Sequence, residues 1–288
     1  MRRSRALKYA FTVPSVLWIL AVSIYPLLRA VYYSFHTYVL GKGITAFVGF
    51  QNYLDNFSNP TFWHASYITL VYVAVTVAAE VVVGVALAWA VNKRIWGQHL
   101  FRVLFTAPLF TTEVAVGYLG VTLFDADTGP ANFFLSLLPF HPHPPWLTTA
   151  FWGLAPAMIL DIWQWTPFVF LVALAGFQGI PGEFYEAASL DTAGEWPVFR
   201  AIALPTIAPV LTIAILLRLM EALKVFGLPY ALTSGGPGTS TQVYSAMVYL
   251  TTIQFFDFGH GSAMGILFLG AVLILILRLF RVMRRQIE

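Results

Sequence analysis

The chain has 288 residues, of which 59% are hydrophobic and only 10% are charged, and its formal net charge is +3. An ordinary soluble domain is about 45–50% apolar and about 25% charged. The composition therefore excludes a soluble domain and indicates a protein whose main solvent is lipid. No cysteine is present, which excludes disulfides and thiolate metal sites. The basic residues lie at the edges of apolar runs, so the positive charge does not indicate a nucleic-acid-binding surface.

Six apolar stretches are long enough to cross a membrane, which takes about 20 residues in a helix. The first follows a basic segment, as in a signal peptide, but its apolar run is too long and no small-residue cleavage site follows. Segments of about ten residues in which apolar and polar side chains alternate, typical of an outer-membrane barrel, are absent. We expect an all-α membrane protein with a single transmembrane domain over residues 1–288. The six predicted transmembrane helices are residues 11–33, 68–91, 101–123, 150–175, 207–226 and 261–280.

The basic residues predict the orientation of these spans. The three loops expected outside the cell contain only Lys42, while Arg29, Arg218 and Lys224 fall within spans. Under the positive-inside rule, the segments that carry the other basic residues are cytoplasmic. Both termini and the segment of residues 176–205 are therefore expected on the cytoplasmic side. The basic residues of the predicted cytoplasmic segments are Arg2, Arg3, Arg5, Lys8, Lys93, Arg94, Arg102, Arg200, Arg278, Arg281, Arg284 and Arg285.

Signatures of enzymes and metal sites are weak. Gly41-Lys42-Gly43 lacks the spacing of a phosphate-binding loop and the Ser or Thr that should follow it. His141 and His143 alternate with prolines in a predicted outer loop, which favours an exposed, stiff turn over a metal site. No Ser/His/Asp arrangement is recognisable. We expect no catalytic residue and no metal site.

Charged residues inside the spans are costly in lipid and should face a protein interior or a wet cavity. Arg218, Glu221 and Lys224 recur at every third residue, so we expect Glu221 to pair with either cation. The fourth span places acceptors and donors beside aromatic rings, a mixture that binds sugars. The charged residues of the spans and the polar residues of the fourth span either line a solute pathway or only join the helices. The second interpretation is favoured for Glu80 and Glu113. The predicted pathway residues are Asp161, Trp163, Gln164, Glu221 and Lys224.

Residues 176–205 form a polar segment between two long apolar runs. Pro181 can open a helix there, and Glu183 and Glu186 favour the positive N-terminal end of that helix. Its apolar face contains small side chains, so another surface can approach closely. A simple linker between two spans does not explain such a helix, which suits a groove on a partner protein. The residues of the apolar face are Tyr185, Ala187, Ala188 and Leu190.

This segment resembles the EAA loop of inner-membrane permease subunits of ATP-binding-cassette importers. The glycine of that pattern is replaced by Thr192, and Gly194 follows two residues later. Residues 47–53, 163–168, 178–181 and 232–241 resemble the carbohydrate branch of the family, the maltose-type and glycerol-phosphate-type permeases. Together the resemblance covers nearly the whole chain. The residues that match the EAA pattern at its spacing are Glu186, Ala187, Ala188, Ile202, Leu204 and Pro205.

The resemblance implies a type I importer permease fold in the cell inner membrane, with alternating access and a cytoplasmic coupling helix between spans four and five. The implied partners are a second homologous permease, a homodimer of ATPase subunits, an extracytoplasmic solute-binding protein and membrane lipid, with no nucleic acid. The chain itself would be no enzyme and would bind no cofactor, because ATP and Mg belong to the ATPase subunits. The implied coupling residues are Glu183, Tyr185, Glu186, Ala187, Ala188, Asp191, Leu204 and Pro205.

Two other functions remain open. Glu80, Glu113 and Asp161 would suit the proton relay of an ion-gradient-driven transporter, and the chain would also suit a non-transporting anchor or sensor. The solute is open as well. Arg218 and Lys224 would suit a glycerol phosphate, whereas acidic and aromatic groups would suit a neutral sugar or polyol.

Overall fold

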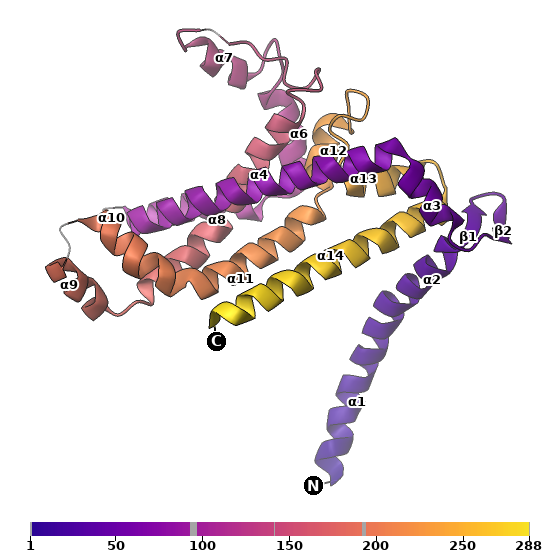
Figure 1. The fold of residues 1–288 in the computed structure, drawn as a ribbon, viewed down its shortest axis with the longest axis horizontal. Helices are drawn as coiled ribbons and strands as arrows, with labels where there is room; N and C mark the ends of the chain where they lie inside the picture. Colours follow the sequence, from indigo (N-terminus) through magenta and orange to yellow (C-terminus); the bar gives the residue numbers. More distant parts are fainter. Residues whose placement is uncertain (1, 93–96, 141, 192–193, 288) are drawn as a thin grey trace. The chain divides into compact units, whose positions relative to one another are not determined.

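The structure is a computed structural model that describes residues 2–92, 97–140, 142–191 and 194–287 (Figure 1). It divides into two compact units. The first contains Met1–Trp63 and Met247–Leu273, and the second contains His64–Ala246 and Ile274–Glu288. Each unit is described by itself below.

The first unit begins with a long, nearly unbroken helix. It consists of α1 (Arg2–Ile19), a π-helical turn η1 (Leu20–Ile24) and α2 (Tyr25–Ser34). The apolar part, Phe11–Ser34, is long enough to cross a membrane, which agrees with the first predicted span. A two-stranded antiparallel hairpin follows, formed by β1 (His36–Val39) and β2 (Gly43–Phe47). Gly41 lies in its turn and Gly43 begins β2, and their positive φ angles of 89° and 72° are favourable only for glycine.

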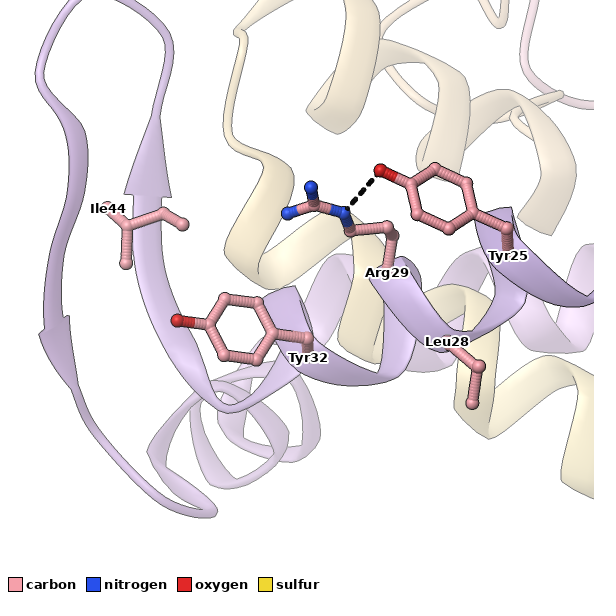
Figure 2. A pocket seen from close by; sticks show the side chains of 5 residues that line it. All are labelled: Tyr25, Leu28, Arg29, Tyr32 and Ile44. Atoms are coloured by element: carbon pink, nitrogen blue, oxygen red, sulfur yellow. Dashed lines mark hydrogen bonds between the residues drawn. The ribbon is translucent and has the colours of Figure 1, made fainter.

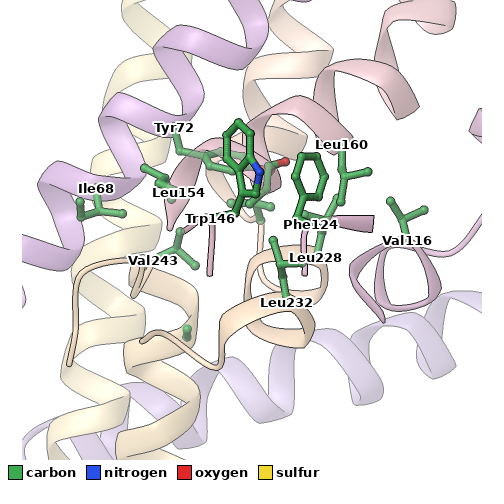
Figure 3. Close-up of a cluster of buried hydrophobic side chains, with 13 residues drawn as sticks. Ile68, Tyr72, Val116, Phe124, Trp146, Leu154, Leu160, Leu228, Leu232 and Val243 are labelled. Atoms are coloured by element: carbon green, nitrogen blue, oxygen red, sulfur yellow. The ribbon is translucent and has the colours of Figure 1, made fainter. Parts of the chain in front are cut away.

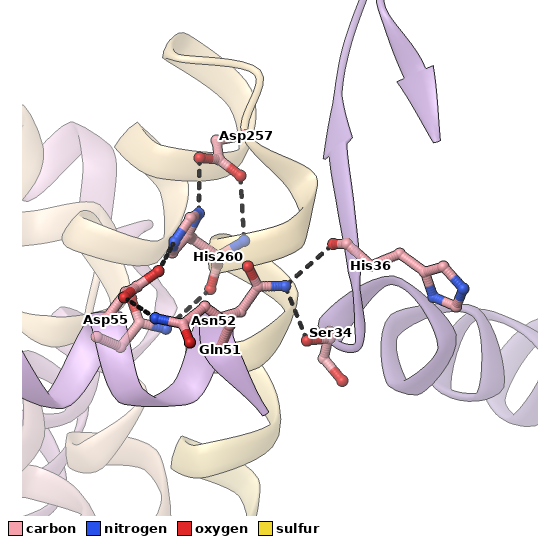
Figure 4. Close-up of polar contacts among 8 residues, drawn as sticks. Ser34, His36, Gln51, Asn52, Asp55, Asp257 and His260 are labelled. Carbon is pink, nitrogen blue, oxygen red and sulfur yellow. Dashed lines mark hydrogen bonds and ion pairs between the residues drawn. The ribbon is translucent and has the colours of Figure 1, made fainter. Parts of the chain in front are cut away.

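Side chains of the short helix α3 (Gln51–Ser58) hold the hairpin in place (Figure 4). Asn52 Nδ2 donates to the carbonyl oxygens of Ser34 and His36, at 2.9 and 3.0 Å. In the same unit, the segment before α14 (Phe258–Ile287) is tied to α3, because His260 contacts Asp257 at 2.9 Å and Asp55 at 3.4 Å. Burial of Asp257 opposes its ionisation, but hydrogen bonds from His260 outweigh burial and lower its pKa below the ordinary value.

Three long helices form the centre of the second unit. They are α4 (Pro60–Val91), α8 (Leu154–Gln178) and a helix over Glu195–Leu223. The last consists of α10 (Glu195–Val198), the π turn η3 (Phe199–Ala203) and α11 (Leu204–Leu223). It begins well before the predicted start at residue 207. Pro205 has no amide hydrogen to donate to the preceding turn, and the chain forms the π turn directly before it.

The third predicted span, residues 101–123, is bent in the structure. Its N-terminal arm contains α5 (Gln98–Thr106) and the 3-10 turn η2 (Ala107–Phe110), and its second arm is α6 (Glu113–Leu123). The arms Leu100–Phe110 and Glu113–Leu123 meet at 99°. Thr111 and Thr112 are extended at the bend, with ψ angles of 148° and 141°, and Thr112 caps α6 by accepting from the Ala115 amide. The described residues therefore give five candidate spans, or six if this bent pair counts as one.

Two apolar clusters hold the second unit together. Figure 3 shows the first, in which Tyr72, Trp146 and Leu228 meet from separate segments. Trp146 is fixed by a 2.8 Å hydrogen bond from Nε1 to Oδ1 of Asn132, in the short helix α7 (Pro130–Ser136). The second cluster joins α4, α8 and α11. There α4 and α8 approach closely at Gly84, where a Cβ would lie 2.9 Å from the Cβ of Val169.

Three shorter helices complete the described chain. They are α9 (Gly182–Asp191), α12 (Gly227–Thr233) and α13 (Tyr244–Tyr249), and the last is followed by the π turn η4 (Leu250–Gln254). Helix α12 packs tightly on α6, since a Cβ on Gly117 would lie 2.7 Å from the Cβ of Ala231. The polar segment predicted to contain a helix does contain one, α9.

Candidate functional site

Helix α9 stands between the ends of α8 and α10, where the EAA-like residues lie. The side chains of Ala187, Ala188 and Asp191 lie outside the described part of the structure, as does Thr192. Gly194 is described and has a φ of 154°, a backbone conformation that side chains rarely adopt. Of the two positions considered for the glycine of the family pattern, the structure therefore describes only Gly194, where the backbone conformation suits glycine.

The side chains of α9 point in different directions. Tyr185 is half-buried, and its hydroxyl donates to the carbonyl oxygen of Phe177 at 3.3 Å. Its ring lies 6.4 Å from that of Trp89, and burial raises the pKa of its phenol. By contrast, the neighbouring Glu183, Phe184 and Glu186 are exposed, Phe184 to 56%.

Tyr185 sits on an aromatic cluster that we call the α9 seat, formed by Trp89, Phe177 and Phe199. The ring centroids of Trp89 lie 5.4 Å from Phe177 and 5.1 Å from Phe199. These residues come from the ends of α4 and α8 and from η3, so the seat connects α9 to three long helices. Leu204 packs on the same apolar cluster, whereas Pro205 is exposed.

The centre of the second unit contains three buried charged residues, which we call the Arg218 triad. Arg218 of α11 donates twice to Glu80 of α4, from Nε at 2.6 Å and from Nη2 at 2.8 Å. Its Nη2 also donates to Asp161 of α8. The side chains of Arg218, Glu80 and Asp161 are only 2%, 0% and 2% exposed. The ring of Trp165 lies 4.8 Å from the guanidinium carbon and adds a cation–π contact.

Of the two cations expected as possible partners of Glu221, the structure pairs it with Lys224, at 2.9 Å between Nζ and Oε1. The side chains of Glu221 and Lys224 are both more than half exposed. Arg218 instead binds carboxylates on two other helices, far away in the sequence. The spacing of three residues indicates only neighbours on one helix, so it could not reveal these partners. Glu80 joins α4 to α11 through Arg218, which is the role that the sequence favoured for it.

The five predicted pathway residues do not gather at one place. Asp161 and Gln164 are buried in the second unit, whereas Trp163, Glu221 and Lys224 are exposed. Gln164 Nε2 donates to the backbone carbonyl of Thr111, at 2.8 Å, and its Oε1 has no hydrogen-bond partner among the described atoms. Gln164 thereby satisfies a carbonyl at the bend of the third span, where the helix itself supplies no donor. Sequence analysis did not identify Thr111.

The first unit has an open cavity of about 410 Å³ that sequence analysis did not identify (Figure 2). Tyr25, Leu28, Arg29, Tyr32 and Ile44 line it. Arg29 Nε donates to the hydroxyl of Tyr25 at 2.9 Å, and its guanidinium lies 5.3 Å from that ring. In the described residues of both units, no three His, Asp or Glu side chains group to hold a metal ion.

Comparison with known proteins gives a consistent result. Residues 80–287 match the family model described as "Binding-protein-dependent transport system inner membrane component". The "Probable ABC transporter permease protein y4oQ" of Sinorhizobium fredii is 35% identical over 98% of this chain and 94% of its own. The "Trehalose/maltose transport system permease protein MalF" of Thermococcus litoralis is 33% identical over 92% of this chain and 89% of its own.

A solved structure has the same fold. A chain of a bacterial ABC transporter "involved in the import of the acidic polysaccharide alginate" has a TM-score of 0.86 and 24% identity, covering 98% of this chain and 96% of its own. The family match includes α8, α9, α11 and α14, and so contains the α9 seat and the Arg218 triad. This chain belongs to the family of inner-membrane components of binding-protein-dependent transport systems.

Proposed function

We propose that this chain is a permease subunit of an ATP-driven importer, and that it moves a sugar, a polyol or a related solute across the cytoplasmic membrane by alternating access. The observation that carries the proposal is helix α9, which lies within the family match and is joined to the ends of the spans by Tyr185. Two relatives support a carbohydrate solute by name. One is MalF, and the other is the "Sulfoquinovosyl glycerol transport system permease protein SmoG" of Agrobacterium fabrum, 33% identical over 91% of this chain and 85% of its own.

The proposal includes partners and an orientation. Both termini and α9 lie in the cytoplasm, in keeping with the basic residues around them. A homodimer of ATPase subunits binds there and holds ATP and Mg. A second homologous permease completes the pathway, and a solute-binding protein delivers solute from outside. This chain binds no cofactor and catalyses no reaction.

In this mechanism the exposed side chains of α9 contact the ATPase, and the half-buried Tyr185 transmits the movement of the ATPase to the spans. Glu183, Phe184 and Glu186 are exposed and suit a groove on the ATPase surface. Closure of the ATPase dimer displaces α9, and the α9 seat carries that displacement to the ends of α4 and α8. Such coupling requires a contact that differs between two states of the complex.

A charge reversal on α9 tests the proposal. With Glu186→Lys, we expect less ATPase to co-purify with the permease, or hydrolysis that continues without uptake. Asp127→Lys is the matched control, because Asp127 is an exposed carboxylate in the loop between α6 and α7. Normal co-purification and normal uptake by Glu186→Lys would contradict the proposal.

A further inference from the structure

We propose that the open cavity of the first unit binds the phosphate group of a phospholipid in the outer leaflet of the membrane. The cavity lies beside α2, and Tyr25, Leu28, Arg29, Tyr32 and Ile44 line it (Figure 2). The coupling through α9 does not involve these five residues. The site itself does not depend on transport, and only its assignment to the outer leaflet rests on the orientation proposed above.

Arg29 differs from the two other cations that the sequence places within spans. Arg218 and Lys224 each pair with a carboxylate of this chain. In the part of the chain that the structure describes, Arg29 forms no ion pair, and its contacts are with phenols. Its Nε donates to the hydroxyl of Tyr25 at 2.9 Å, and its guanidinium lies 5.3 and 6.0 Å from the rings of Tyr25 and Tyr33. Neutral phenols hold the guanidinium in place but do not neutralise its charge, so the site still suits an anion.

The depth of Arg29 in the membrane indicates which anion is at hand. None of the most apolar stretch of the span Phe11–Ser34 is buried within the chain. Counting about 1.5 Å per residue, Arg29 lies about 7–8 Å from the end of the span at Ser34. A charged side chain at that depth extends toward the lipid headgroups rather than staying in the hydrocarbon. Figure 2 shows this direction, since the guanidinium extends along α2 toward Tyr32 and Ile44. The charge is thereby directed toward the level of the lipid phosphates.

The walls of the cavity suit both parts of a phospholipid. Tyr25, Leu28, Arg29 and Tyr32 follow one another at three or four residues, so they share one face of α2. A guanidinium can bind two phosphate oxygens at once, and the hydroxyl of Tyr32 can donate to a third. Leu28 and Ile44 are apolar and are 61% and 44% exposed, so they offer a surface to the first part of an acyl chain. A free phosphate ion would leave this apolar surface uncovered.

Hydrogen bonds fix the hairpin that forms the outer wall of the cavity. Nδ1 of His36, at the start of β1, donates to the carbonyl oxygen of Tyr32 at 2.7 Å, and the two rings lie 4.1 Å apart. Asn52 donates to the carbonyl oxygens of Ser34 and His36. Ile44 lies on β2, which pairs with β1. These contacts fix Ile44 and Tyr32 relative to each other, so the site needs no rearrangement of the hairpin to bind a lipid.

The test is a titration of the whole purified importer with short-chain phosphatidylglycerol, read by native mass spectrometry. We expect Arg29→Gln to lose one bound lipid per importer that the wild type retains, a weakening of at least about tenfold at this site. Lys42→Gln is the matched control with an unchanged lipid count, because Lys42 is an exposed cation of the same hairpin that does not line the cavity. Tyr32→Phe keeps its ring beside His36 and should weaken the same binding about threefold, which provides a second measurement if Arg29→Gln fails to assemble.

Two further probes identify what the site recognises. Diacylglycerol with the same chains lacks the phosphate and should not occupy the site, and inorganic phosphate at an equal concentration should not displace the lipid. Displacement by inorganic phosphate would overturn the proposal in favour of a free anion. Equal lipid counts in Arg29→Gln and the wild type would also overturn it. Loss of the second permease from the Arg29→Gln importer, with the lipid count unchanged, would assign Arg29 to an ion pair with that subunit. None of these lipid counts depends on uptake, so the proposed function is tested separately.

Discussion

The Arg218 triad and the α9 seat both connect α4, α8 and α11 or its extension, but they do so by different physical means. The triad uses charge in a site that excludes water, and each of its residues depends on the others. The seat uses aromatic packing and one hydrogen bond, and its neighbours on α9 are exposed. Buried charge networks lose much when one member is removed, whereas aromatic contacts weaken in smaller steps. A substitution in the Arg218 triad should therefore destabilise the fold more than a substitution in the α9 seat.

The largest effect should come from the triad. Arg218→Met leaves Glu80 and Asp161 buried without a cation, and we expect a loss of about 3–5 kcal/mol in stability. Lys224→Met is the matched control at the exposed pair, where at most about 1 kcal/mol is expected. Thermal unfolding of the purified importer in detergent measures both. Equal losses in the two variants would show that burial does not distinguish these ion pairs.

The second effect concerns coupling rather than folding. Tyr185→Ala removes the ring that rests on Trp89, so we expect more ATP hydrolysed per solute imported, with the ATPase still bound. Tyr185→Phe keeps the ring and loses only the hydrogen bond to Phe177, about 0.5–1.5 kcal/mol, so its coupling should stay near normal. Simultaneous assays of uptake and hydrolysis give the ratio. A normal ratio in Tyr185→Ala would remove the seat from the mechanism.

A smaller effect is expected where α4 and α8 touch. Gly84→Ala places a methyl group 2.9 Å from the Cβ of Val169 and 3.0 Å from the amide nitrogen of Phe170. Overpacking of this kind costs about 1–3 kcal/mol. Gly270→Ala on α14 is the control, because nothing lies within 4 Å of its added Cβ. The melting temperature of Gly84→Ala should therefore be lower than that of Gly270→Ala. An unchanged melting temperature in Gly84→Ala would mean that α4 and α8 can move apart at this point.

The smallest effect is a dependence on pH in the first unit. Asp257 has a lowered pKa in the folded chain, so its contribution is present above its ordinary pKa of 3.8 and is lost as the pH falls through the lower folded value. The protection of α3 and of the start of α14 against hydrogen exchange, relative to the intrinsic exchange rate at each pH, should therefore fall on acidification below about pH 4. Asp257→Asn should reduce this dependence. If Asp257→Asn kept the full pH dependence, another titratable group would be responsible for that dependence.

The sequence predicted the broad fold because long apolar runs and edge charges are strong, local signals. It missed the bend at Thr111 and Thr112, since both arms are apolar and only Pro108 marks the interruption. It also missed the hairpin of β1 and β2, although paired turn glycines between β-branched and aromatic residues are a recognisable hairpin pattern.

The candidate site was predictable to a similar extent. Each charged member of the triad was identified as costly in lipid. Asp161 and Glu80, however, lie 57 and 138 residues away from Arg218 in the sequence, and no local spacing indicates such pairs. The existence of α9 followed from its residues. The inward orientation of Tyr185 did not, because it depends on Trp89 and Phe199, which no local pattern places beside it.

The bend in the third span depends on a side chain that another helix supplies. Lipid provides no donor for an interrupted helix backbone, and the amide of Gln164 supplies one to Thr111 from α8. The oxygen of the same amide, Oε1, has no hydrogen-bond partner among the described atoms. Rotation of the Gln164 side chain would therefore leave the carbonyl of Thr111 without this donor, so the bend of one helix depends on a single amide group carried by another.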